Sequence, residues 1–257
     1  MEEELAGFVK EFGISREIRR GPLVIRETPK HAPSGPDRGG ESRGGTKSER
    51  PGLVLCVSGV GKVLTAAAVQ FCIDRYAPSA IIHTGIAGAL ASLPIGDILV
   101  AESSLQWDFD ARPFARRRGE IPRAGIRDIP ADPDLLRAVT ALRPKGFRIH
   151  RGRIVTGDTV LYRKNDGKYS FLTEELGASA VDMESGSAAI VAAMNGIRFL
   201  SFKVISDDAE GGKPSLFGRF VRKSSGKCVT LVNAAMKELV RDFPGPGESD
   251  TAPEGRY

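Results

Sequence analysis

The chain has 257 residues, of which 41% are hydrophobic, and a formal net charge of +5 at pH 7. This length and composition indicate a globular protein with one large domain or two small ones. No apolar run approaches the ~20 residues of a membrane span. The first residues lack a basic stretch followed by an apolar one, and the basic clusters lack the interleaved aromatic side chains of a nucleic-acid surface. We expect a cytoplasmic protein that binds neither membranes nor nucleic acids.

The first feature in chain order is the acidic start MEEELAGF, residues 1–8. Charge runs at chain ends usually face water, so a solvated start is the simplest interpretation. Two later segments lack the apolar content of a packed core. Residues 32–50 contain no aliphatic side chain larger than alanine, and residues 244–257 are rich in Pro, Gly and charge. We expect a single domain over 1–243, with a disordered loop at 32–50 and a disordered tail at 244–257.

Short β-branched runs alternate with helical stretches between these segments. In chain order they are 52–59, 62–76, 79–85, 96–106, 148–157, 168–177, 178–184, 185–196, 198–208 and a last helix near 217–243. Strands that are almost continuously apolar and alternate with helices are typical of a parallel sheet buried on both faces. We therefore predict a single three-layer α/β domain, with a mostly parallel central sheet and helices on both faces.

Three cysteines, Cys56, Cys72 and Cys228, are widely spaced and form no CxxC pair. This spacing indicates neither a disulfide framework nor a zinc site. We expect reduced, mostly buried thiols and no metal.

Polar and Gly-rich motifs follow several predicted strands. They are SGVGK (58–62), HTGIAGAL (83–90), VTGDTVLY (155–162), VDMESG (181–186) and VISDDAE (204–210). Ligands of open α/β sheets bind beyond the carboxyl ends of the strands, so we expect the site there. SGVGK is not a phosphate loop, because a Walker loop needs Ser or Thr at Val63 and Gly at Cys56. A dinucleotide fingerprint fails at Leu64, where its third glycine should stand.

Two carboxylates at these strand ends are candidates for chemistry. Asp207 ends an apolar strand, where partial desolvation would raise its pKa toward that of a useful general acid, whereas Asp208 is expected to be solvated. Glu184 begins a helix, so it either interacts with the helix dipole or accepts hydrogen bonds from vicinal hydroxyls. The residues alone leave both interpretations of Glu184 open.

The motifs together resemble a known enzyme family. SGVGKVLTAAAVQ, HTGIAGAL, PIGDILVAESSLQWDFDARPF, VTGD, VDMES and VISD resemble, in order and spacing, the 5′-methylthioadenosine/S-adenosylhomocysteine nucleosidases of the nucleoside phosphorylase-like superfamily. The resemblance covers roughly residues 1–12 and 52–240. It implies a homodimeric N-glycosyl hydrolase of methionine salvage. Such an enzyme releases adenine from 5′-methylthioadenosine, S-adenosylhomocysteine and 5′-deoxyadenosine without metal or cofactor.

The resemblance assigns roles at the reacting bond. Asp207 would protonate adenine N7, and Ser206 would orient Asp207 and the base. Glu184 would hold the ribose 2′ and 3′ hydroxyls, with Met183 packed under the sugar. Glu4, in the MEEE run, would activate the attacking water.

Other positions would line the substrate pocket. Phe114 and Phe217 match apolar positions around the 5′-alkylthio group, and Leu161 matches the position whose backbone hydrogen-bonds adenine. Val160 stands where the family often has an aromatic side chain, and Ile86 where it often has serine near the ribose.

Three further features concern the choice between hydrolase and phosphorylase, the placing of the attacking water, and the first strand of the fold. Phosphorylases carry an arginine for phosphate where this chain has His83, which favours hydrolysis. Lys203 replaces an arginine that commonly braces the carboxylates, so water positioning is expected to be looser. The family has an apolar strand before its glutamate run. None precedes MEEE here, so we expect an open slot in the sheet unless translation starts upstream.

Three alternatives stay open at this point. One is a phosphate-dependent purine nucleoside phosphorylase. Another is a futalosine-type hydrolase, which GIAG also resembles, although QWDFDARPF argues against it. The third belongs to a different class: a catalytically impaired nucleoside-binding protein.

Overall fold

The computed structural model describes residues 8, 11–12, 16–27, 53–112, 114, 117–161, 167–207 and 217–242. The predicted loop at 32–50, the predicted tail at 244–257 and Glu4 lie outside these ranges. In the described part of the chain, no helix is long and apolar enough to cross a membrane.

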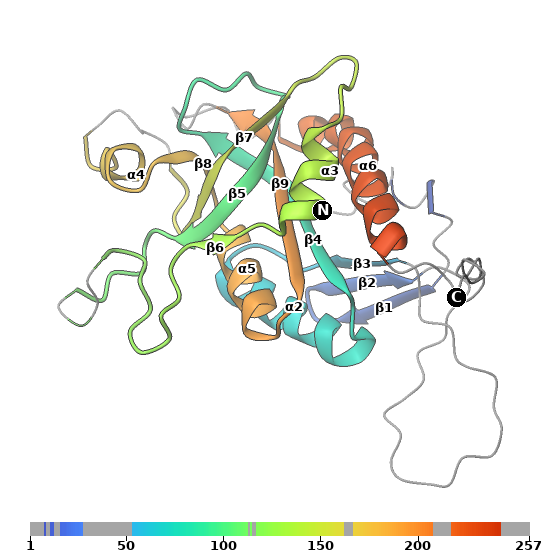
Figure 1. Cartoon of the computed structure of the whole chain (residues 1–257), viewed down its shortest axis with the longest axis horizontal. Helices are drawn as coiled ribbons and strands as arrows, with labels where there is room; N and C mark the ends of the chain where they lie inside the picture. The colour runs from blue at the N-terminus through green and yellow to red at the C-terminus, as the bar shows by residue number, and fades with distance from the viewer. Residues whose placement is uncertain are drawn as a thin grey trace, which may run out of the picture.

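Two sheets and five helices make up the described fold (Figure 1). The smaller sheet has the order β1-β2-β3, from Arg16–Arg20, Leu23–Glu27 and Val54–Val57. The larger sheet has the order β6-β5-β7-β8-β4-β9, from Ile129–Pro130, Ile98–Gln106, Ile149–Thr156, Ala178–Asp182, Ala80–Ala89 and Arg198–Asp207. The helices are α2 Lys62–Tyr76, α3 Pro133–Thr140, α4 Phe171–Glu174, α5 Ser185–Met194 and α6 Phe217–Asp242.

The larger sheet is mixed and closes on itself, so the prediction of a mostly parallel sheet is confirmed only in part. β4 pairs in parallel with β9, but its last residues, Gly88 and Ala89, pair antiparallel with β8. β5 pairs in parallel with β7, and its start at Ile98–Val100 also pairs antiparallel with β9. The strands β5, β7, β8, β4 and β9 therefore form a ring. The register shift after Ala87 bends β4, and strand-helix alternation in a sequence does not reveal such bends.

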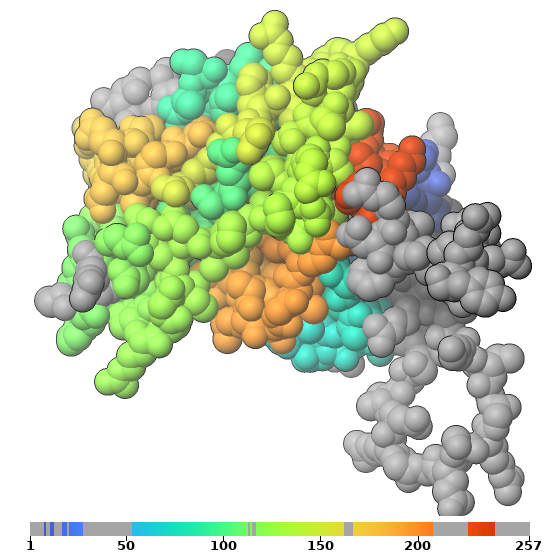
Figure 2. Space-filling view, viewed as in Figure 1, coloured from blue at the N-terminus to red at the C-terminus, as the bar shows by residue number. Residues whose placement is uncertain are grey.

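Helices cover the strands from two sides, as predicted. Side chains on β9 alternate between these sides: Phe202 packs with α3 and α6, and Phe199 packs with α5. α2 and α5 lie side by side, which Figure 2 shows on the surface as neighbouring cyan and orange patches. The interior of the strand ring holds mostly small side chains, from Ala87, Ala89, Leu99, Ala101, Ile154, Ala180 and Ile205.

Gly157, in the VTGD motif, lies directly against the ring of Trp107. A Cβ at Gly157 would lie 2.4 Å from Trp107 Cε2, which is closer than real contacts allow. Trp107 is buried in a cluster with Leu161 and Leu172, so it has little room to move. Glycine is therefore required at this position for packing, independently of any role in the site.

We predict that Gly157→Ala lowers the free energy of unfolding by about 1–3 kcal/mol, because the added methyl overpacks the core. Urea denaturation followed by far-UV circular dichroism measures the change. Gly226→Ala is the matched control. Gly226 lies in α6 with open space around its Cβ position, so alanine there is expected to stabilise the helix by up to about 1 kcal/mol. Equal stability of Gly157→Ala and the wild type would contradict the packing argument.

Candidate active site

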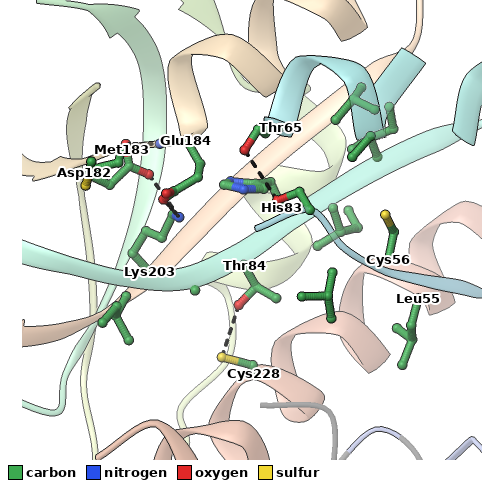
Figure 3. A pocket seen from close by; sticks show the side chains of 18 of the residues that line it. Leu55, Cys56, Thr65, His83, Thr84, Asp182, Met183, Glu184, Lys203 and Cys228 are labelled. Carbon is green, nitrogen blue, oxygen red and sulfur yellow. Dashed lines mark hydrogen bonds and ion pairs between the residues drawn. The ribbon is translucent and has the colours of Figure 1, made fainter. Parts of the chain in front are cut away.

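A cavity of about 830 Å³ lies between β3 and β4 and continues to the carboxyl ends of β4, β8 and β9. Helix α2 lines one side of it and α6 another. Figure 3 shows Asp182, Glu184 and Lys203 together at one end of the cavity, with Leu55 and Cys56 at the other.

The cavity separates two strands that have no described partner on the facing edges. Among the described strands, β3 pairs only with β2, and residues Ala80 to Ala87 of β4 pair only with β9. An open slot in the sheet was expected from the sequence, without a position for it.

A buried lysine joins two carboxylates at the polar end of the cavity. Lys203 Nζ, on β9, lies 2.9 Å from Asp182 Oδ2 and 3.8 Å from Glu184 Oε2. The Lys203 side chain passes over β4 at Gly85, where a Cβ would lie 3.1 Å from Nζ. Gly85, the first glycine of HTGIAG, thus leaves room for the Lys203 ammonium group, which links β9 to β8 across β4.

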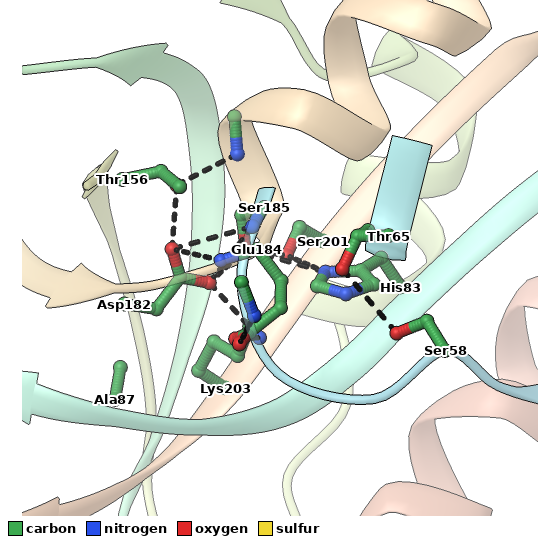
Figure 4. A network of polar contacts seen from close by, with 12 residues as sticks. Ser58, Thr65, His83, Ala87, Thr156, Asp182, Glu184, Ser185, Ser201 and Lys203 are labelled. Carbon is green, nitrogen blue, oxygen red and sulfur yellow. Dashed lines mark hydrogen bonds and ion pairs between the residues drawn. The ribbon is translucent and has the colours of Figure 1, made fainter. Parts of the chain in front are cut away.

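Of these three residues, Asp182 has the most hydrogen-bond partners in the described structure (Figure 4). Its Oδ1 accepts a hydrogen bond of 2.5 Å from Thr156 Oγ1, and its Oδ2 accepts bonds from the backbone and side chain of Ser185. Burial alone would raise the pKa of Asp182, but the Lys203 ammonium and these hydrogen bonds hold it below the usual value. Asp182 is therefore an anion that fixes Lys203 in place.

Glu184 is held less tightly than Asp182. Its Oε1 accepts a hydrogen bond of 3.1 Å from the backbone of Gly61, which lies in the turn between β3 and α2. Its side chain lines the cavity and is partly exposed. The SGVGK turn thus serves to orient a carboxylate, and the carboxylate itself faces the space where a ligand would lie.

His83 lies behind these carboxylates and is neutral. Its Nδ1 lies 3.3 Å from Ser185 Oγ and 3.4 Å from Ser201 Oγ. Since Ser185 Oγ donates to Asp182, the consistent assignment makes His83 Nδ1 the donor toward the serines. Burial, together with the nearby Lys203 charge, lowers the pKa of His83 to about 3. His83 therefore carries no charge near neutral pH.

Asp207 and Ser206 end β9 at the cavity. Ser206 Oγ donates to Asp207 Oδ2 at 2.6 Å and also contacts the carbonyl oxygen of Ala87 at 3.2 Å. The serine therefore orients the carboxyl group of Asp207 relative to β4. Asp207 is partly exposed, so a ligand can reach it.

An ion cluster ties together the loops around the cavity. Lys62 Nζ lies 2.7 Å from Asp108 Oδ1 and 3.5 Å from Asp158 Oδ2. The backbone of Asp158 also donates to Asp108 Oδ2 at 2.9 Å. These contacts join the SGVGK turn, the QWDFD segment and the VTGD loop.

The sequence profile of the phosphorylase superfamily matches residues 13–241. A 5′-methylthioadenosine/S-adenosylhomocysteine nucleosidase of Staphylococcus haemolyticus is 31% identical over 189 residues, which cover 73% of this chain and 82% of that protein. The chain belongs to the phosphorylase superfamily, in the family of these nucleosidases. A relative in Treponema pallidum with the same name is 31% identical over 66% of this chain and 76% of its own length.

Solved structures agree with this family. A Helicobacter pylori 5′-methylthioadenosine/S-adenosylhomocysteine nucleosidase has a TM-score of 0.75 and 25% identity, covering 93% of this chain and 95% of that one. That nucleosidase was crystallised with a bound compound that contains an amino-pyrrolopyrimidine and an alkylthio group. The futalosine hydrolase of the same organism also has a TM-score of 0.75 and 25% identity, covering 93% and 94%.

The structure gathers most of the residues that the nucleosidase motifs singled out. Ile86, Val160, Leu161, Met183, Glu184, Lys203, Ser206 and Asp207 all line the cavity. Phe114 does not: its side chain is 85% exposed and it is not among the residues that line the cavity. Glu4 and the side chain of Phe217 lie outside the described residues.

Several members of the polar network were not singled out from the nucleosidase motifs. Asp182, Thr156 and Ser185 were read only as parts of VDMES and VTGD. The available signal was a polar side chain at the end of each of two strands, β7 and β8, which pair in parallel and place Thr156 opposite Asp182.

The neutral state of His83 predicts a dependence of stability on pH. Its pKa is about 3 in the folded protein and about 6.5 when unfolded, so the unfolded chain takes up the proton first. The stability that His83 contributes is complete above pH 6.5 and is lost as pH falls toward 3. His83→Asn should remove up to about 1.4 kcal/mol per pH unit from the slope in this window. Urea denaturation at several pH values measures it, and parallel curves for both proteins would refute the assignment.

Proposed function

We propose that the protein hydrolyses the N-glycosidic bond of 5′-methylthioadenosine and S-adenosylhomocysteine, and also of 5′-deoxyadenosine, to release adenine in methionine salvage. The observation that carries this proposal is that Asp207 and Glu184 line one cavity together with Leu161. A carboxyl group for the base and a carboxylate for the sugar are thus available in the same cavity. Membership of the nucleosidase family supports the same assignment.

In the proposed reaction Asp207 acts on the base. The glycosidic bond breaks as positive charge develops on the sugar, so adenine has to leave as a neutral molecule. Asp207 donates a proton to N7 of adenine, and its hydrogen bond from Ser206 keeps the carboxyl group in a fixed orientation. The backbone of Leu161 binds adenine, and Val160 packs against it with less stacking than an aromatic ring would give.

The sugar is held from the other side. Glu184 accepts hydrogen bonds from the 2′ and 3′ hydroxyls, while Gly61 and Lys203 keep its carboxylate in place. Met183 packs under the ribose, with Ile86 nearby on β4. Binding energy from these contacts holds the sugar in position as its charge develops.

Water is the proposed nucleophile, and Glu4 is the proposed group that orients and deprotonates it. Hydrolysis is favoured over phosphorolysis because the charges needed for phosphate are engaged elsewhere. His83 is neutral, and Lys203 is paired with two carboxylates, so neither offers the charge that a phosphate dianion requires. No step of this mechanism uses a metal or a cofactor.

The 5′-alkylthio group would lie against apolar side chains, for which Phe114 and Phe217 stay candidates. The exposure of Phe114 is compatible with this role if a second subunit covers it. The start of α2 also exposes Val63 and Leu64, and Val160 is exposed at the cavity. In this proposal these exposed apolar side chains belong to the interface of a homodimer, which is the working form.

We expect a particle of twice the chain mass in size-exclusion chromatography with light scattering. Val63→Glu should shift it toward the monomer, since a charge would be buried in the proposed interface. Met194→Glu is the matched control, because Met194 is a similarly exposed apolar residue at the end of α5. A monomer in the wild type, or an equal shift by both variants, would argue against this interface.

The test of the reaction is adenine release from 5′-methylthioadenosine and S-adenosylhomocysteine, with and without phosphate. We expect release in both conditions, with free sugar as the second product. Release that requires phosphate and yields a sugar 1-phosphate would place the protein among the phosphorylases.

Asp207→Asn tests the role of the acid within the same assay. We expect kcat to fall by about 10²–10⁴-fold, because asparagine cannot supply the proton. Binding of 5′-methylthioadenosine, measured by calorimetry, should change little. Ser206→Ala is the partner variant and should lower kcat by less. An equally slow wild type with intact binding would favour the nucleoside-binding protein over the enzyme.

Futalosine is a second candidate substrate, because the Helicobacter pylori futalosine hydrolase is as similar in structure as the nucleosidase. Including futalosine in the assay compares the two at the same cavity. A higher kcat/KM for futalosine would assign the protein to that reaction instead.

A further inference from the structure

The ion cluster of Lys62, Asp108 and Asp158 lies just outside the cavity. None of its three side chains is among the residues that line the cavity. The side chains of Lys62 and Asp108 are nevertheless mostly buried, and the Lys62 ammonium contacts both Asp108 oxygens, at 2.7 and 2.8 Å. The proposed hydrolysis gives this cluster no part. Such an ion cluster either supports the fold alone or holds a group that faces the ligand.

The start of α2 links the cluster to Glu184. Gly61 precedes the helix and has no side chain that could cap the first turn. Two carboxylates from distant parts of the chain take that place. The Gly61 N–H donates to Glu184 Oε1 at 3.1 Å. The next N–H, that of Lys62, donates to Asp158 Oδ1 at 3.0 Å. Negative charge is favoured at a helix N-terminus, so both carboxylates are stabilised there.

The backbone at Gly61 has a conformation that residues with a side chain rarely adopt. Its φ is +96°, in the region that favours glycine. A Cβ at this position would also lie 3.3 Å from Asp158 Oδ1. The direction of the Gly61 N–H therefore depends on how the turn is held, and the contacts of the neighbouring Lys62 hold it.

The hydrogen bond from Gly61 is the shorter of the two described contacts of the Glu184 carboxylate. The other is the ion pair with Lys203, in which Nζ lies 3.8 Å from Oε2. Because the two contacts act on different oxygens, loss of the Gly61 contact would leave Oε1 without its described donor. The carboxylate could then turn about its bond to the side chain.

We propose that Lys62 and Asp108 are positioning residues, which aim Glu184 at the ribose hydroxyls by holding the Gly61 N–H on its carboxylate. The inference rests on the proposed function, because that function assigns the sugar to Glu184. Without the Lys62 ammonium, Asp108 and Asp158 would be neighbouring anions that repel each other. Asp158 would then move away from the start of α2, and the turn would lose the contact that aligns Gly61.

The first measurement needs no substrate. It follows backbone amide hydrogen exchange at Gly61 by NMR in the full-length protein. We expect exchange in Lys62→Met to be at least about tenfold faster than in the wild type, because the N–H loses its acceptor. Lys227→Met is the matched control, since Lys227 is a partly buried lysine whose ammonium donates to the carbonyl oxygen of Gly96 instead. It should leave exchange at Gly61 unchanged.

The second measurement tests recognition of the sugar. Calorimetry gives the Kd of 5′-methylthioadenosine and of its 2′,3′-dideoxy analogue, which lacks the hydroxyls assigned to Glu184. All proteins carry Asp207→Asn, so that neither ligand is consumed. We expect Lys62→Met to raise the Kd of 5′-methylthioadenosine about 3–10-fold more than that of the analogue. A general loss of structure would weaken both ligands equally.

Asp108→Asn provides a second variant if Lys62→Met does not fold. Asparagine can still accept a hydrogen bond from Lys62 but carries no charge, so we expect smaller changes in the same direction. Unchanged exchange at Gly61, or an equal loss of affinity for both ligands, would overturn the inference. If exchange at Gly61 responds as expected but the wild type neither binds nor cleaves 5′-methylthioadenosine, the proposed function fails while the hold of the cluster on Glu184 stands.

Discussion

The buried ion pair between Lys203 and Asp182 is the contact on which the site depends. It joins β9 to β8 across the intervening strand β4, and Glu184 and His83 take their positions around it. Lys203 is 1% exposed, so its charge has no access to water as a substitute partner. Removing one member of such a pair costs about 3–5 kcal/mol, because the other charge stays buried without compensation. The geometry of the cavity and the stability of the sheet therefore depend on the same few atoms.

The helices and strands whose positions the sequence predicts well are those that contain long apolar runs. The strand at 198–208 and the helices at 62–76 and 185–196 lie within two residues of β9, α2 and α5. Helix α3 was missed although Asp132 caps its first turn and Pro133 begins it, a local signal that sequence rules recognise. The strands β1 and β2 were missed because both are short and β1 is rich in charge.

Closure of the sheet could not have been predicted in the same way. It depends on Ile98–Val100 meeting Phe202–Val204, two segments about a hundred residues apart whose own sequences are ordinary buried strands. The candidate site, too, could be predicted from the sequence only in part. Asp207 and Glu184 could be proposed from the sequence because one carboxylate ends an apolar strand and the other begins a helix. The role of Gly85 emerges only when Lys203 is seen passing over it.

The closed ring of strands also explains where a ligand can bind. Its interior is packed with alanines and a few branched side chains, such as Ile154 and Ile205. The cavity lies beside β3 and at the carboxyl ends of β4, β8 and β9, where turns and helix ends supply polar atoms. The closed ring thus acts as a rigid support, and the surrounding turns form the surface that can contact a ligand. Substitutions in the turns can alter what is bound without touching the packing that keeps the ring closed.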